Sequence, residues 1–469
     1  MKALARIAAL LSGWLDERLG ISAVLMPIVA HPVPRSINFW YVFGSATLTA
    51  FVVQVVTGVA LAFTYVPAPN SAYDSLQFIT SGAALGSVVR GIHFFGASAM
   101  VILISIHMAR VFVMGAYKFP RELNWLSGVG LLFLTLGMAF TGQLLRWNQD
   151  AYWAVVVAAE QAARAPLIGQ FLAQIIIAGQ TVGGATLTRF YATHVFLLPA
   201  LMFGLIGLHL YLIVRHGISE PPQSGQPVER QTYQARYQAL LAREGVPFWP
   251  DIAWRDVLFA LAVGAVVVLL AVYVGPPALG KLADPTDVQA QPRPDWYLLW
   301  YFALLALIPP GLEDIFIIGA PLLAVVTLLA LPLLAPLGER SPRRRPWTWA
   351  VVGFSALSIA LLIRVGDAAP WSPSFDPPPL PAAVTQNLAA VPAQGAALFH
   401  ANSCHSCHAI AGTGGRRGPD LTFAGERLTP AQLTTRILNG GPNMPPFANV
   451  LKPDELSALV EFLAGLRRE

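Results

Sequence analysis

The sequence predicts an all-α membrane protein with seven transmembrane helices, followed by a small all-α soluble domain. Hydrophobic residues make up 55% of the chain and charged residues only 12%, which is far from the composition of soluble proteins. Seven stretches lack Asp, Glu, Lys and Arg and come close to or exceed the length of about 20 residues that one crossing needs. These stretches are residues 39–65, 91–109, 125–145, 190–214, 257–280, 315–337 and 346–363.

Basic residues in the connections predict the orientation. The connections after the second, fourth and sixth spans are rich in them: Arg110, Lys118, Arg121; Arg215, Arg230, Arg236, Arg243, Arg255; Arg340, Arg343, Arg344, Arg345. Because such connections face the cytoplasm, the N-terminus is expected inside and the C-terminal domain outside. We therefore expect a multi-pass protein of the bacterial inner (cytoplasmic) membrane with a periplasmic C-terminal domain. A net charge of +5 is too small and too dispersed to indicate nucleic-acid binding.

The two ends of the chain differ from the spans. The first 20 residues predict an amphipathic helix on the inner membrane surface rather than a signal peptide, because Asp16, Glu17 and Arg18 directly follow a short apolar run. Residues 369–392 include DPPPLPAA and predict a semi-rigid linker. Residues 393–469 are expected to form the soluble domain.

That domain contains the only two cysteines of the chain, Cys404 and Cys407, and His408 directly follows the second. C-x-x-C-H is the attachment signal for a covalent c-type haem, in which the two thiols bind the haem and the histidine binds the iron. The alternatives are a disulfide, a redox pair or a chance match. The predicted topology favours the haem, because it places the motif on the outer side, where c-type haems are attached.

Met444 is the expected sixth ligand of the haem c iron. It is the only methionine in the soluble domain, and ligation by histidine and methionine raises the potential of the iron. His400 and His405 are alternative ligands, although we expect both to lie at the surface.

Four histidines lie within the predicted spans, His93 and His107 in the second and His194 and His209 in the fourth. Ionisable residues in membrane helices are costly and usually functional. Spacings of fourteen and fifteen residues are close to four helical turns and separate each pair by roughly 21–22 Å. Two such helices side by side would offer two stacked bis-histidine sites for noncovalent b haems. The alternative is four buried histidines satisfied by hydrogen bonds.

Glycines and arginines support a four-helix dihaem bundle. Gly44 and Gly58 lie fourteen residues apart in the first span, as do Gly128 and Gly142 in the third. A flat macrocycle needs such gaps, although helix packing alone also uses small residues. The candidates for neutralising haem propionates are Arg90, Arg110 and Arg189.

The segments RGIHFFGASAMVILISIHMAR and TLTRFYATHVFLLPALMFGLIGLHL resemble the haem-binding helices of cytochrome b in quinol-oxidising cytochrome bc complexes. The fifteen-residue spacing, YKFPRELNW and WLDERLGIS resemble the cytochrome b/f branch. Residues 1–222 are similar to its four-helix cytochrome b, residues 223–368 include its three-helix subunit IV-like part, and residues 393–469 resemble a class I cytochrome c domain.

The resemblance implies where each b haem binds. His93 and His194 would hold the low-potential haem near the outer face, and His107 and His209 the high-potential haem near the inner face. In the cytochrome b/f branch a cysteine attaches an extra haem at the position of Val42, so a covalent bond of that kind is not expected here. An extra noncovalent haem stays open.

The resemblance also implies an outer quinol site. RPDWYLLW, in the connection after the fifth span, is similar to the family's P-E-W-Y motif, with Asp295 in place of the glutamate that accepts a proton. Pro294, Trp296 and Tyr297 would line this site together with the segment WNQDAYW. The segment LRW at 145–147 departs from the family's proline before tryptophan. Without the family, PDWY would be an acidic turn followed by interfacial aromatics.

An inner quinone site is implied by PFWPDIAWRDVLF, which resembles the segment before the family's fifth helix. Asp256 matches the acid of that site and Arg255 its basic neighbour, with His216 as a third candidate. The alternative is that these residues are solvated anchors at the membrane interface.

The expected function is that of a cytochrome b–c fusion in a quinol:cytochrome c oxidoreductase. Quinol would be oxidised outside, and electrons would pass through the two b haems and, through a Rieske iron–sulfur partner, to haem c, with proton translocation. The Rieske cluster needs two cysteines that this chain does not have to spare, so its subunit must be separate. Other expected partners are the quinone pool, membrane lipids, cytochrome c or another periplasmic acceptor or terminal oxidase, and a second copy in a homodimer. The alternatives are a dihaem anchor for another dehydrogenase or reductase, and a transporter with histidine relays.

Overall fold

A computed structural model describes residues 2–179, 181–284, 292–368, 378–415, 418–441, 444–448 and 450–468, without the side chains of 2–9, 24, 25, 27, 28 and 310. In this part of the chain, seven helices are long and apolar enough to cross a membrane, which confirms the predicted number of spans. They are α3 (Phe43–Ala62), α5 (Gly86–Val113), α6 (Glu122–Leu144), the continuous helix Gly184–His216, α12 (Ala253–Tyr273), α14 (Glu313–Leu334) and α15 (Pro346–Ala368).

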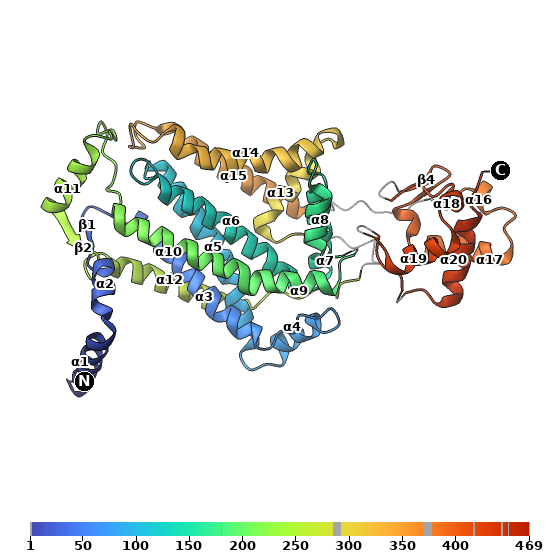
Figure 1. Ribbon diagram of the computed structural model, residues 1–469, viewed down its shortest axis with the longest axis horizontal. Helices are drawn as coiled ribbons and strands as arrows, with labels where there is room; N and C mark the ends of the chain where they lie inside the picture. The colour runs from blue at the N-terminus through green and yellow to red at the C-terminus, as the bar shows by residue number, and fades with distance from the viewer. Residues whose placement is uncertain are drawn as a thin grey trace.

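The first four spans form a bundle. α3 packs along α5, and α10 (Leu198–His216) packs along α6, with α12 against α3 and α5 (Figure 1). The core between them contains small and large apolar side chains, among them Ala46, Ala50, Phe51, Met100 and Met202. Small residues allow helix backbones to approach closely in a membrane, where lipid gives no hydrophobic drive for association. The bundle therefore sets two helix pairs side by side.

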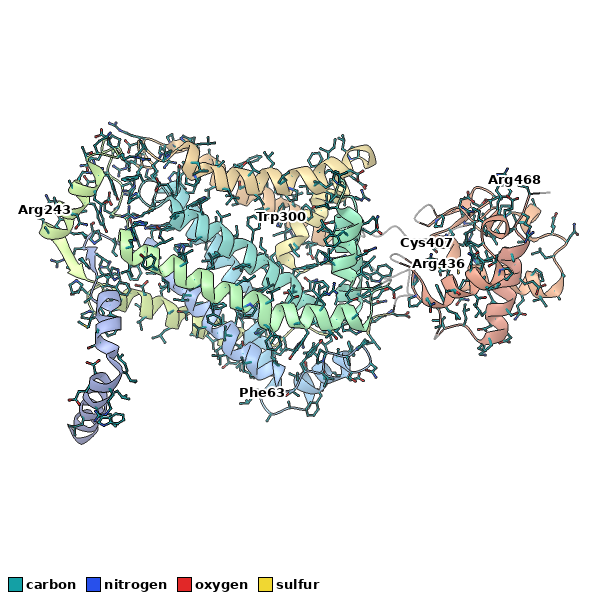
Figure 2. All side chains as sticks on the ribbon, viewed as in Figure 1. Phe63, Arg243, Trp300, Cys407, Arg436 and Arg468 are labelled. Atoms are coloured by element: carbon teal, nitrogen blue, oxygen red, sulfur yellow. The ribbon has the colours of Figure 1, made fainter. Side chains whose placement is uncertain are left out.

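The end of the bundle with the arginine-rich connections is called the basic end below. There, β1 (Pro32–Pro34) and β2 (Gly245–Pro247) form a short antiparallel ribbon. A small core of Val33, Ile37 and Ile252 joins it to the start of α12. The remaining elements at this end are α1 (Lys2–Leu19), α2 (Ile21–Val29), η1 (Phe39–Tyr41) and α11 (Tyr233–Glu244). Figure 2 shows Arg243 on α11 at this end.

The opposite end of the bundle is covered by a separate group of short helices. It consists of α4 (Ala72–Ser81), α7 (Gln149–Ala163), α8 (Gly169–Ile177), α13 (Trp296–Leu307) and η3 (Pro310–Leu312). α7 and α8 pack together around a core that includes Tyr152, Val155 and Leu187. Residues 296–307, part of the predicted outer connection, form a twelve-residue helix. The fifth span ends at Tyr273 rather than near residue 280, because Gly275 adopts a φ of +78° and two prolines follow it.

A π turn interrupts the fourth span. α9 (Gly184–Ala192) runs through η2 (Thr193–Leu197) into α10, and the Leu198 N–H donates to the Thr193 carbonyl five residues earlier. Such a turn accommodates one residue more than an α-helical turn. At about 100° per residue, a fifteen-residue spacing would rotate His209 by about 100° relative to a fourteen-residue spacing. The π turn, which contains His194, absorbs the fifteenth residue and gives both histidine pairs the same helical phase.

The C-terminal domain is a separate helical unit (Figure 1). Its elements are α16 (Ala382–Thr385), α17 (Ala390–Ala401), η4 (Cys404–Ser406), β3 (Ala409–Ile410), β4 (Thr413–Gly414), α18 (Ala424–Arg427), α19 (Pro430–Asn439) and α20 (Pro453–Gly465). α17 crosses α20, and the rings of Phe399 and Phe462 lie 6.1 Å apart there. α17 begins three residues before the boundary expected at 393, and Leu380, Val384 and Leu388 already pack against the core of the domain.

Candidate functional site

His93 on α5 and His194 in the π turn face each other across the bundle. Their ring centroids lie 6.4 Å apart and their planes are nearly perpendicular, at 81°. When two imidazoles bind one metal ion from opposite sides, each ligating nitrogen lies about 2 Å from the metal, as it does for zinc. The centroids of the two rings are then about 6 Å apart. The spacing of these two rings therefore fits a bis-histidine iron site.

Each of the four predicted glycines lies against one of the four histidines. A Cβ atom added to the glycine would meet the nearest ring atom at these distances: Gly142–His194 2.7 Å, Gly44–His107 3.1 Å, Gly58–His93 3.2 Å and Gly128–His209 3.6 Å. The two helix pairs thus bring each histidine onto the bare backbone of a neighbouring helix. Sequence reasoning assigned the glycines to the haem face, whereas in the structure they make room for the four histidine rings.

The three arginines proposed for propionates differ in their surroundings. Arg110 stacks over the Tyr41 ring at 3.5 Å, and its Nε and Nη2 atoms are buried without a hydrogen-bond partner among the described residues. Unpaired buried donors on a cation fit an anionic group. Arg90 instead donates to Thr80 Oγ1 at 3.1 Å and the Pro277 carbonyl at 2.8 Å. Arg189 is exposed and donates to the Ile175 carbonyl.

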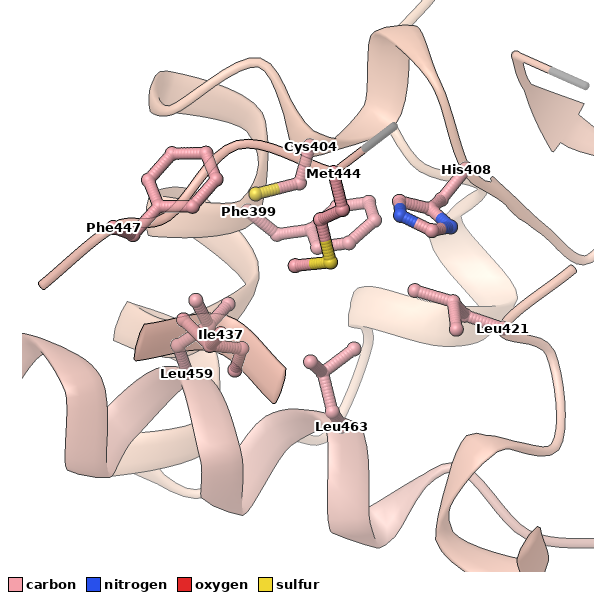
Figure 3. A pocket seen from close by; sticks show the side chains of 9 residues that line it. All are labelled: Phe399, Cys404, His408, Leu421, Ile437, Met444, Phe447, Leu459 and Leu463. Carbon is pink, nitrogen blue, oxygen red and sulfur yellow. The ribbon is translucent and has the colours of Figure 1, made fainter. Parts of the chain in front are cut away.

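In the C-terminal domain, Cys404, His408 and Met444 line one apolar pocket (Figure 3). The other lining residues are Phe399, Leu421, Ile437, Phe447, Leu459 and Leu463. His408 Nδ1 lies 2.8 Å from the Pro419 carbonyl, so Nδ1 carries the proton and Nε2 is left to bind a metal. Burial lowers the pKa of His408, which favours the neutral ring that ligates iron. The donor set therefore fits a haem c held by His408 and Met444.

The alternative ligands His400 and His405 do not line this pocket. His400 is exposed, as expected. His405 is fully buried, which corrects the expected surface position. Its ring packs against Phe399 at 6.0 Å and pairs with His400 through the two Nδ1 atoms, 3.5 Å apart. The tight turn η4 directs this side chain into the domain.

The carboxylate of Asp295 lies at the start of α13, at the end of the bundle opposite the basic end. Its Oδ1 atom is 3.0 Å from Arg146 Nη2, and its Oδ2 atom accepts a hydrogen bond from the Tyr297 hydroxyl at 3.1 Å. Pro294 precedes it, and the Trp296 ring N–H donates to Ser98 Oγ on α5 at 3.1 Å. Three of the four residues predicted for the outer quinol site thus have defined polar or packing contacts. The structure shows that Arg146, which stands in place of the family's proline, is the ion-pair partner of Asp295.

The three residues predicted for the inner quinone site lie at the basic end, and each has a different partner. Asp256, in the first turn of α12, accepts a hydrogen bond from Ser45 Oγ. Arg255 donates to the Ile37 carbonyl, and His216 Nδ1 lies 3.1 Å from Asn124 Oδ1. Ser45, the partner of Asp256, directly follows Gly44, the glycine that lies against the His107 ring. The Asp256 carboxylate is therefore bonded to a residue that neighbours one of the histidine contacts.

Comparisons with known proteins divide the chain into three matched parts. The family described as "Cytochrome b/b6/petB" matches residues 28–217, and "Cytochrome b(C-terminal)/b6/petD" matches residues 282–375. Cytochrome b6 of Heliobacterium modesticaldum is 45% identical over 210 residues, which are 44% of this chain and 99% of that protein. The chain belongs to the cytochrome b family.

Two further comparisons extend the family relationship. The menaquinol:cytochrome c reductase cytochrome b subunit of Bacillus subtilis is 43% identical to this cytochrome b over 217 residues, which are 44% of this chain and 96% of that subunit. A solved structure titled "Hyperthermophilic respiratory Complex III" has a TM-score of 0.65 and 28% identity, covering 76% of this chain and 91% of that one. The predicted fold class, an all-α membrane protein with a cytochrome c domain, is confirmed.

The third part distinguishes this cytochrome b from those relatives. Residues 390–463 match the family described as "Cytochrome C oxidase, cbb3-type, subunit III". The chain is therefore a cytochrome b of the bc type joined to a cytochrome c domain. The predicted fusion is confirmed, and the residue roles assigned to each part stay predictions.

Sequence reasoning missed a set of hydroxyls that orient the histidines of this cytochrome b. Thr57, Ser127 and Thr141 lie within 2.8–3.0 Å of Nδ1 of His93, His209 and His194, respectively. Each hydroxyl donates its own proton to a backbone carbonyl on its helix, so it accepts from the Nδ1–H. Nε2 is then left as the metal-binding atom. The available signal was that each hydroxyl residue directly precedes one of the four glycines.

Proposed function

We propose that this chain is the quinol-oxidising core subunit of a cytochrome bc complex that carries its own haem c. Two b haems would be held by His93 with His194 and by His107 with His209, and the covalent haem c by Cys404, Cys407, His408 and Met444. The three haems would supply one-electron carriers at two depths of the bundle and in the outer domain. The observation that carries the proposal is the facing pair His93 and His194, whose ring centroids lie 6.4 Å apart, in a bundle that also has the Asp295 carboxylate at the end opposite the basic end.

The outer site would oxidise quinol. A quinol that loses two electrons also loses two protons, so an acceptor for a proton must lie within hydrogen-bond reach, directly or through one water. Asp295 is partly exposed and has an ion-pair partner, which makes it the best candidate among the outer residues. Aromatic rings of Trp296 and Tyr297 would line the same pocket.

The inner site would reduce quinone at the basic end. Asp256 and Arg255 lie in the first turn of α12, and His216 ends α10. Uptake of protons there and release outside would translocate protons across a bacterial cytoplasmic membrane. A separate Rieske iron–sulfur subunit would take the electron that leaves for haem c, and a homodimer is the expected assembly.

The competing function is a dihaem anchor that connects another dehydrogenase or reductase to the quinone pool. The ordered Arg146–Asp295–Tyr297 cluster favours quinol oxidation, because an anchor needs no proton acceptor at the outer end. Purification of the native complex with subunit analysis tests the choice. A co-purifying Rieske subunit and quinol-dependent reduction of an added cytochrome c support the proposal, whereas a dehydrogenase subunit without a Rieske protein contradicts it.

A further inference from the structure

The two oxygens of the Asp295 carboxylate have unequal partners. Oδ1 pairs with the guanidinium of Arg146 at 3.0 Å, in an ion pair whose side chains are 15% and 19% exposed. Oδ2 accepts from the neutral hydroxyl of Tyr297 at 3.1 Å. A charge-assisted bond is stronger than a bond between neutral groups. The partner of Oδ2 is therefore the easier one to displace.

Arg146 is itself held in place. It follows the last turn of α6, and its Nε–H donates to the Gln143 carbonyl at 3.3 Å. The Asp295 backbone N–H donates to the side-chain oxygen of the same Gln143, also at 3.3 Å. Gln143 is buried, so the end of α6 and the start of α13 are joined at one point. The Arg146 guanidinium therefore approaches the Asp295 carboxylate from a helix end that is held in place.

Tyr297 can release Oδ2 without losing a hydrogen bond. Its hydroxyl has one proton and two acceptors within reach, Asp295 Oδ2 at 3.1 Å and the Ala139 carbonyl at 3.0 Å. It can donate to only one of them at a time. Burial raises the pKa of Tyr297 well above its usual value, so the hydroxyl keeps its proton. Donation to Ala139 leaves Oδ2 open.

We propose that Arg146 is a positioning residue of the outer quinol site, which holds Oδ1 of Asp295 and so presents Oδ2 as the oxygen that accepts the quinol proton. The O–H bond of the quinol hydroxyl breaks, its electron pair stays on the quinol oxygen, and the proton forms a bond with Oδ2. Tyr297 then donates to the Ala139 carbonyl. This inference rests on the proposed quinol oxidation and names the residue that orients its proton acceptor.

Both members of the pair depart from the motifs of the family that the sequence resembles. The resembling family has a glutamate at position 295 and a proline at position 146, so it combines a longer acid with a residue that carries no charge. An aspartate reaches less far, and its orientation then matters more. Arg146 supplies that orientation with a planar fork that lysine lacks.

Steady-state quinol oxidation by the purified complex tests the inference, with quinol as the varied substrate. Arg146→Met should lower kcat by about 10- to 100-fold, which is less than the full contribution of about 10²- to 10⁴-fold expected for proton transfer by a positioned side chain, because the acceptor itself is retained. It should change KM by less than about threefold. Arg146→Lys, which retains the cation, should recover part of that loss. The double variant Arg146→Met/Asp295→Asn should be no slower than Asp295→Asn alone, because both substitutions remove the same interaction.

Arg164→Met is the matched control. Arg164 also pairs with carboxylates at this end of the bundle, with Glu313 and Asp314 at 2.9 Å each. Within the described part of the chain its side chain forms no hydrogen bond or ion pair with Asp295, Arg146 or Tyr297. It should leave kcat unchanged. The absorption of all three haems after dithionite reduction confirms that each variant is assembled. Should Arg146→Met lose haem, Arg146→Gln replaces it, with the same loss of kcat expected.

The outcomes separate the inference from the proposed function. A wild-type complex that does not oxidise quinol overturns both. Wild-type turnover with unchanged kcat in Arg146→Met or Arg146→Gln overturns only the inference. So does a multiplicative loss in the double variant, or a raised KM at constant kcat, which would mean that Arg146 binds quinol itself.

Discussion

Gly142 on α6 lies so close to His194 that a Cβ atom on the glycine would stand 2.7 Å from the imidazole Cε1. Real Cβ atoms do not approach carbon atoms so closely, and overpacking of this kind typically costs about 1–3 kcal/mol. The His194 ring is also held by the neighbouring residue of α6, Thr141, whose hydroxyl lies 3.0 Å from His194 Nδ1. A side chain at position 142 must therefore displace the ring that is proposed to bind iron.

Gly142→Ala is expected to reduce the content of the outer b haem, because the displaced His194 ring no longer faces His93. The matched substitution is Gly128→Ala, whose Cβ would lie 3.6 Å from His209, an ordinary van der Waals distance. Redox difference spectra of the purified variants measure the b-haem content of Gly142→Ala and Gly128→Ala. Equal haem content in the two variants would show that the glycine contacts do not position the ligands.

Because of the π turn, we expect the fourth span to tolerate the deletion of one residue between His194 and His209. Removing Phe196, an exposed residue of the turn, shortens the His194–His209 spacing to fourteen residues and should convert the π turn to an α turn with both b haems retained. Removing Ile102 of α5, which is also exposed, should rotate His107 by about 100° relative to His93 and lose a haem. Loss of haem in both deletions, or in neither, would contradict this account of the spacing.

The proposed sites predict how many haems per chain are covalently attached and how many are not. Acid–acetone extraction should remove two haems per chain, those held only by histidines, and leave one attached through Cys404 and Cys407. The ratio is measured from pyridine haemochrome spectra of the extract and the residue. A covalent count of zero or two per chain would be incompatible with the proposed sites.

Met444→Leu is expected to keep haem c covalently attached but lower its midpoint potential. Loss of a methionine ligand removes a group that raises the potential of the iron, and axial ligands change haem potentials over about 0.8 V; we expect a shift on the order of 0.1 V or more. Phe447→Leu alters the same pocket without touching a ligand and should shift the potential far less. Redox titration of both variants decides; an unchanged potential in Met444→Leu would mean another residue is the sixth ligand.

Much of this fold follows from local sequence properties. The spans are predictable because each is a continuous apolar run, and the histidine pairs and C-x-x-C-H because their spacing reflects helix geometry and covalent chemistry. α13 was not predicted as a helix, because PDWY has the composition of a turn and its helical continuation is a short apolar run. The burial of His405 was missed because it depends on the direction of one tight turn.

The outer cluster shows the limit of such reasoning most clearly. Asp295 was found from its motif, but its partner Arg146 is 149 residues away in the sequence. Neither periodicity nor composition relates the two positions. Only the packing of the end of α6 against the start of α13 brings them together. The hydroxyls on His93, His194 and His209 were missed for the same reason, although their position before glycines is a local signal.

Rapid mixing of the purified complex with quinol, monitored at the separate absorption bands of b and c haems, tests the central claim most directly. If the chain is the core of a quinol-oxidising bc complex, haem c and a b haem should be reduced together in the first turnover, and Asp295→Asn should slow both while dithionite still reduces all three haems. Reduction of b haems with haem c left oxidised, in a complex that contains its iron–sulfur partner, would contradict the account and favour a dihaem anchor.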